Sequence, residues 1–178
     1  EETEAQIETE EIMMSLEDIK ELVEDLKLDV LKTEEMDWEQ VQKSEESLQK
    51  MEDVISEIEQ LQNNLEKIAE MAENNNLVSD ELKDKFSELQ EILNELMTPE
   101  LLEAMEEMQQ AMEEMNPEKM LDALENFENN MQEFEEQLDR FLDLFKQAMA
   151  EQKMDEVVKR LEEMLTEQTD INEKLNND

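Results

Sequence analysis

Carboxylates are the side chains most able to do acid–base chemistry in this sequence, because it contains no histidine, cysteine or tyrosine. Asp and Glu total 55 against 15 Lys and Arg, which gives a formal net charge of −40. Pairs such as Glu106–Glu107 and Glu113–Glu114 bring two carboxyl groups together, but a general acid at neutral pH needs a pKa raised by burial. Their pattern places them on solvated helix faces. We therefore expect no catalytic residue and no enzymatic activity.

Nucleophilic, metal and phosphate sites are disfavoured by the same composition. The serines have no histidine to activate them, and the chain has no glycine for an oxyanion loop, a phosphate-binding loop or an EF-hand. Without histidine, the Glu-x-x-His ligands of carboxylate di-iron bundles are also excluded. We expect diffuse, weak binding of Ca²⁺ or Mg²⁺ by the charged surface, but neither a metal site nor a cofactor.

Methionine is the residue type whose abundance and placement suggest binding. There are 15 methionines, and Met105, Met108, Met112 and Met115 share one face of a predicted helix with Leu101. We favour an adaptable core seam. The alternatives are a pliable groove for a helix of another protein, and capture of Cu(I) by the thioethers, which the lack of Cys or His co-ligands disfavours.

The single tryptophan, Trp38, stands at a predicted helix start. Asp37 precedes it and Gln40 follows three residues after Asp37, the spacing of a capping box. Trp38 is either an exposed docking anchor for a partner or a staple that packs over the corner between two helices. We favour the staple.

These candidate residues need helices to position them, and the sequence predicts little else. With no glycine and two prolines, strong helix formers dominate, and apolar residues recur at alternating spacings of three and four. This periodicity argues against a disordered chain, which high charge and 3% aromatic content would otherwise fit. Six helices are predicted: about 2–32, 38–73, 79–96, 99–115, 117–152 and 155–175.

Local signals support the ends of these helices. Thr98-Pro99-Glu100 and Asn116-Pro117-Glu118 each combine a capping residue, a proline at the first helical position and an acid. Ser79 is a predicted N-cap, and the chain is expected to reverse at residues 74–76, a run of three asparagines. A weak break is predicted at residues 153–155.

The helix from Pro117 is the most regular and carries four of the five phenylalanines, so we expect the others to pack around it. Its predicted buried face is Met120, Leu124, Phe127, Met131, Phe134, Leu138, Phe141, Phe145 and Ala148. The other predicted faces are Ile12, Leu16, Ile19, Val23, Leu26 and Val30, widened by Leu22 and Leu31; Leu48, Met51, Ile55, Ile58, Leu65 and Ile68, with Val54 and Leu61 beside them; Leu82, Phe86, Leu89, Leu93 and Leu96; and Val158, Leu161, Leu165, Ile171 and Leu175.

The predicted fold is all-α: an elongated helical bundle or antiparallel coiled-coil array with a thin core. We expect a single helical segment over 1–178, with a subdivision into a long helical pair (1–76) and a part with short helices, the long Phe-rich helix and a C-terminal helix (77–178). Since the sequence opens at Glu1 rather than Met, we expect it to be a processed product or a segment excised from a longer protein. No apolar run approaches the roughly 18 residues of a spanning helix, so we expect a soluble segment without direct membrane insertion.

The acidic charge restricts the partners. It repels phosphate backbones and anionic lipid, so nucleic acid is excluded as a partner, whereas a protein partner, in particular a basic one, or self-association is expected. Mutual repulsion should also raise the pKa values of crowded carboxylates, so that the folded chain gains stability on mild acidification.

Several stretches occur in an order that resembles large bacterial envelope proteins of the family catalogued as domain of unknown function 4175. The resemblance spans about residues 37–175 and rests on Asp37-Trp38-Glu39, Leu77-Val78-Ser79-Asp80-Glu81-Leu82, Thr98-Pro99-Glu100-Leu101, Asn116-Pro117-Glu118 and Ala150-Glu151-Gln152-Lys153-Met154-Asp155. It implies membrane-spanning helices near the N-terminus of the whole protein, followed by long charged helical regions such as this one. It transfers no functional residue.

The sequence therefore predicts a non-enzymatic structural or protein–protein interaction module, a helical spacer or scaffold. The alternative is an acidic chaperone-like protein that binds basic or amphipathic helical segments through its Met-rich face.

Overall fold

The chain folds as helices joined by short connections. The computed structural model describes residues 2–74 and 79–176, and side chains over 4–74 and 79–167. Its elements are α1 (Glu2–Val30), α2 (Trp38–Asn74), α3 (Asp80–Glu95), α4 (Pro99–Glu114) and α5 (Pro117–Asn176), with no strand among the described residues. The all-α prediction is confirmed. Within the same residues, no helix combines the length and the apolar character that a membrane crossing requires.

The prediction of six helices is wrong, because α5 continues without interruption for 60 residues through the expected break at 153–155. That stretch has neither proline nor glycine, so nothing removes a backbone hydrogen bond from the helix. The side chains of Ile171 and Leu175, predicted to belong to a sixth helix, lie outside the described residues, as do residues 75 and 76 of the expected reversal.

The helix ends follow the capping signals. Gln40 N donates to Asp37 Oδ1 at 2.9 Å and Asp37 N donates to Gln40 Oε1 at 3.0 Å, which completes the capping box. The hydroxyls of Ser79 and Thr98 each accept a backbone N–H from three residues later, both at 3.1 Å. Both prolines stand at helix starts, so the prediction of separate helices at these positions is confirmed.

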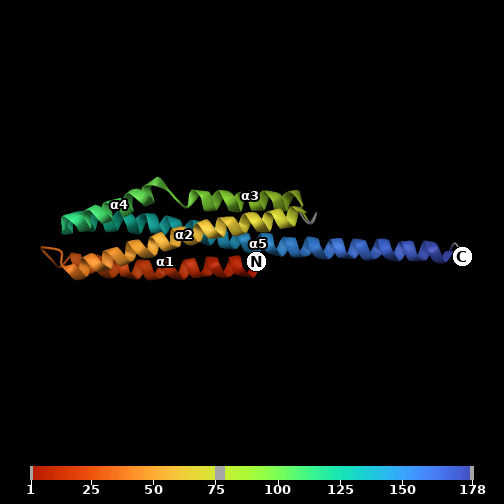
Figure 1. Cartoon of the computed structure of the whole chain (residues 1–178), viewed down its shortest axis with the longest axis horizontal. Coiled ribbons are helices and arrows are strands. Elements are labelled where there is room, and N and C mark those ends of the chain that lie inside the picture. The colour runs from red at the N-terminus through yellow and green to blue at the C-terminus, as the bar shows by residue number, and fades with distance from the viewer. Residues whose placement is uncertain (1, 75–78, 177–178) are drawn as a thin grey trace.

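The helices lie side by side as rods, one of which is broken (Figure 1). Helices α3 and α4 follow each other along one rod, while α1, α2 and α5 form the others. Packing joins α1 to α2, α2 to α3 and α4, and α5 to α1, α3 and α4. Lys20 Nζ lies 2.7 Å from Glu135 Oε2 and Lys27 Nζ lies 2.6 Å from Glu128 Oε2, so α1 and α5 run in opposite directions.

One contiguous apolar core runs through the bundle. All nine residues of the face predicted for α5 are buried, and the rings of Phe141 and Phe145 stack with centroids 5.9 Å apart. The main faces predicted for α1 and α3 are also buried. Leu31 is not: it lies just beyond α1 and is 61% exposed, so the prediction that it widens the buried face is wrong.

The buried face of α2 differs from the predicted one in its first half. Leu48 and Ile55 are only partly buried, whereas Gln40, Ser44 and Ser47 are buried. The Ser44 and Ser47 hydroxyls each donate to the carbonyl four residues earlier at 2.9 Å, which offsets the cost of removing them from water. In the first turns of α2, small hydroxyl residues therefore occupy the buried face, which a pattern of apolar residues does not predict.

The buried methionines of α4 provide a test of the core. Replacing Met108 and Met112 together with Ala should lower the free energy of unfolding by several kcal/mol, since a fully buried Met→Ala change costs about 2 to 5 kcal/mol. Urea unfolding followed by circular dichroism measures this. The matched control replaces the exposed Met14 and Met71, where we expect less than about 0.5 kcal/mol per site. Equal losses in the two double variants would contradict the packing described here.

Candidate interaction site

The methionine face of α4 is turned mostly inward. Met105, Met108 and Met112 are buried together with Leu101, so the core-seam interpretation is confirmed for these three. It is wrong for Met115, which is 43% exposed. Met115 caps the C-terminus of α4 with a left-handed backbone (φ 51°) and so leaves the helical stripe.

Trp38 does not pack over the corner between α1 and α2. It is 69% exposed, so the staple interpretation is wrong. The two staple positions, one residue before the cap Asp37 and four residues after it, are instead occupied by the buried residues Met36 and Val41. Trp38 remains a candidate docking residue on the surface.

A groove separates the first half of α2 from α4. It has a volume of about 830 Å³, and Val41, Leu48 and Met112 contribute apolar surface to it. Its charged lining consists entirely of carboxylates: Glu45, Glu46, Glu52 and Glu113. Met112 is the methionine of α4 that lines this open, acidic groove.

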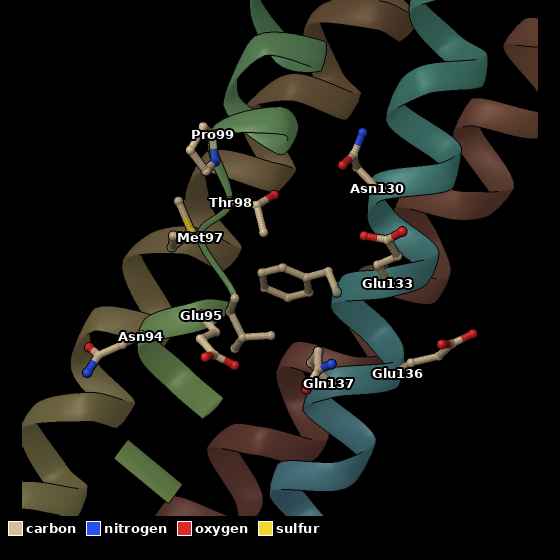
Figure 2. Close-up of a pocket in the computed structure, with 11 residues that line it drawn as sticks. Asn94, Glu95, Met97, Thr98, Pro99, Asn130, Glu133, Glu136 and Gln137 are labelled. Carbon is tan, nitrogen blue, oxygen red and sulfur yellow. The ribbon is translucent and has the colours of Figure 1, made fainter. Parts of the chain in front are cut away.

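A second pocket, of about 540 Å³, lies where α3 gives way to α4 and both face α5. Figure 2 shows Thr98 at this break and Asn130, Glu133 and Gln137 across from it on α5. Its only charged lining residues are three exposed glutamates, Glu95, Glu133 and Glu136. No group of acidic residues suited to holding a metal ion occurs among the described residues. The helix break therefore leaves three exposed carboxylates beside this pocket.

The largest run of exposed apolar residues lies on α5 beyond the bundle. Figure 1 shows the C-terminal part of α5, the tail, continuing past the other described helices. Among its side chains that the structure describes, which extend to residue 167, the large apolar ones are between 51% and 68% exposed. We call them the tail stripe: Met154, Val157, Val158, Leu161, Met164 and Leu165.

The tail stripe is on the opposite side of α5 from the bundle core. From Phe145 to Leu161 the helix advances sixteen positions, which at about 100° per residue is four full turns plus about 160°. The six members of the tail stripe lie within about 60° of Leu161 around the helix axis. The apolar pattern therefore changes face between Gln152, after which no residue up to 167 is buried, and Met154.

Charged residues border the tail stripe asymmetrically. Viewed around the axis from Leu161, Lys153 and Arg160 lie about 80° and 100° to one side. Asp155 and Glu162 lie about 120° and 100° to the other side. Over residues 153–162 the charged residues within about 100° of Leu161 are thus basic on one side of the stripe and acidic on the other.

Ion pairs attach α5 to the bundle up to the point where the tail begins. A hydrogen bond to the carboxylate of Glu135 raises the pKa of Lys20, and one to Glu128 raises that of Lys27. At the exit, Lys85 of α3 pairs with Glu151, which precedes the buried Gln152. Ion pairs with α1 and α3 therefore attach α5 to the bundle as far as Glu151, just before the tail.

Comparison of the chain with protein-family models, with curated proteins and with solved structures gave no match. The resemblance to the envelope family therefore stays a prediction from the sequence motifs.

Glu57 tests how charge opposes folding. Burial, with the nearby carboxylates of Glu11, Asp53 and Glu8, raises its pKa above the ordinary value of 4.5. The folded chain thus binds this proton at a pH where the unfolded chain does not, and the free energy of unfolding rises as the pH falls through the raised pKa. Glu57→Gln should be more stable than wild type at pH 7 and should gain less on acidification to pH 5.

The measurement is urea unfolding at pH 7, 6 and 5, with Glu59→Gln as a control for the same loss of charge at an exposed position. Lys43 lowers the pKa of Asp29, and Lys119 lowers that of Glu114, so their stabilising contributions are lost only as the pH falls below the ordinary values of 3.8 and 4.5. Identical pH profiles for the two variants would show that Glu57 does not carry this effect.

Proposed function

We propose that this chain is a non-enzymatic helical spacer that docks another protein surface through the tail, as part of a bacterial envelope protein. The observation that carries the proposal is the tail stripe, six large apolar side chains that face water on a helix continuing out of the bundle. Single exposed apolar residues are ordinary, but a contiguous apolar face on a helix is typical of an interaction surface. The envelope assignment rests on the sequence resemblance alone.

The spacer part of the proposal is supported by length and rigidity. The 60 residues of α5 span about 90 Å at about 1.5 Å per residue, and its first half is packed on α1, α3 and α4. A helix anchored in this way presents its free end at a fixed distance and rotation relative to the bundle. Such a device holds two attached components apart, and it needs no catalytic group.

A second candidate function is the binding of basic amphipathic helices in the groove between α2 and α4. The observation in its favour is the all-acidic charged lining around Leu48 and Met112. Only one methionine borders this groove, so the Met-rich face offers less apolar surface than a chaperone-like protein would use.

Photo-cross-linking in cells that make the protein tests the docking function. A benzophenone amino acid at Met164, within the tail stripe, should give a discrete cross-linked product, because the stripe is covered in the assembled state. The same group at the neighbouring Glu163, which is exposed but lies off the stripe, should give little or none. Absence of a discrete product from both positions, or equal products from both, would contradict docking through the stripe.

A further inference from the structure

We infer that the tail stripe is covered by the tail of a second copy of this chain, aligned in parallel. This inference rests on the proposed docking function and names the partner. It comes from the two borders of the stripe, which have opposite charges and flank the same apolar face.

Parallel copies related by rotation about an axis along their helices bring opposite borders together. The left border of one stripe then faces the right border of its neighbour, in a pair or in a larger ring. Arg160 of one copy would face Glu162 of the next. The same face is therefore self-complementary in charge as well as apolar.

An antiparallel arrangement lacks this complementarity. It places like borders against each other, so that Arg160 and Lys153 approach the basic border of the other copy, and Asp155 and Glu162 approach its acidic border. Like charges that face each other across the contact between two helices destabilise the association of those helices. The charge pattern thus favours the parallel alignment.

The bundle that carries the tail does not cover the stripe. Helices α1 and α3 pack on the core face of α5, and the tail stripe lies about 160° away from that face. Members of the stripe remain more than half exposed beside the described helices. A neighbouring tail must therefore approach α5 from the side opposite its core face. The tails can then pair without displacing the helices of either bundle.

The width of the stripe also fits self-association. Apolar residues occupy three positions per heptad, represented by Leu161, Met164 and Leu165, whereas a two-stranded seam needs two. A face this broad is suited to two or more neighbours, as in a parallel bundle of tails.

Sedimentation equilibrium of the full 178-residue chain tests the proposal. Wild type should associate reversibly, and Leu161→Glu should shift the association midpoint to at least about tenfold higher concentration. Leu31→Glu, at a similarly exposed residue outside the tail, adds the same charge and should associate like wild type. Circular dichroism confirms that both variants fold. A wild type that is monomeric throughout, or equal effects of the two substitutions, would overturn self-pairing.

Charge reversal tests the alignment. In the parallel arrangement Arg160→Glu and Glu162→Arg should each weaken association. The double variant should restore it, because residues 160 and 162 then again face each other with opposite charges. In the antiparallel arrangement Glu162→Arg would strengthen association, since each copy would then bring one basic residue to the place where two acidic borders meet. Strengthening by that single variant would overturn the parallel alignment.

Single cysteines give an independent readout, because the chain has none of its own. In a parallel assembly Met154→Cys and Leu161→Cys should each form an intermolecular disulfide on oxidation, since identical positions of the stripe meet in every heptad. An antiparallel pair allows this at one position at most. Failure of both cysteines to cross-link in an associating chain would also overturn the parallel arrangement.

The experiments distinguish failure of the inference that a second copy covers the stripe from failure of the proposed docking function. A monomeric chain that still gives a discrete product with a different protein from Met164 would overturn the second copy as the occupant and leave the docking function standing. A monomeric chain without any such product would overturn both.

Discussion

The buried apolar stripe of α5 is the contact on which the rest of the bundle depends. Helices α1, α3 and α4 pack against α5, and α2 is held by packing on α1 and on the α3–α4 rod. The stripe carries the largest fully buried side chains of the core, Phe127, Phe141 and Phe145. This packing has to outweigh the mutual repulsion of a chain with a net charge of −40, which is why its three-and-four spacing continues without a gap up to Gln152.

Much of this architecture was accessible from the sequence, for identifiable reasons. Prolines 99 and 117 stop and start helices because of their fixed φ and missing N–H, and the capping residues ahead of them satisfy orphan amides. The apolar faces of α1, α3 and α5 followed directly from helical spacing. Spacing alone missed Ser44 and Ser47, because a hydroxyl bonded to its own helix backbone can occupy a core position that a count of apolar residues cannot recognise.

The interaction site shows a different limit of sequence analysis. At residues 153–155 the apolar residues move to another face of the helix. In a sequence, such a shift cannot be distinguished from the end of one helix and the start of another. Val158, Leu161 and Leu165 were therefore predicted as the buried face of a separate helix, whereas a continuous α5 turns them to the opposite side from Phe145. Trp38 was a candidate because tryptophan is rare in this chain, and the α4 methionines because methionine is abundant. Whether each of these side chains is exposed depends on neighbouring helices, which composition does not reveal.

Continuity of α5 also determines how the charge of the bundle acts on the tail. Because the stripe begins at Met154, two residues after Gln152, parallel tails hold their bundles close together at one end, and bundles of like charge repel. This repulsion is greatest where the tail leaves the core, and it weakens with distance and with salt, since the Debye length is about 10 Å at 0.1 M. Residues 153–160 counter it locally, with three basic residues, Lys153, Lys159 and Arg160, against two acidic ones. In the proposed assembly, the apolar contact between tails forms next to the place where the acidic bundles repel each other most strongly. The basic residues at 153–160 reduce that repulsion, which accounts for their position in so acidic a chain.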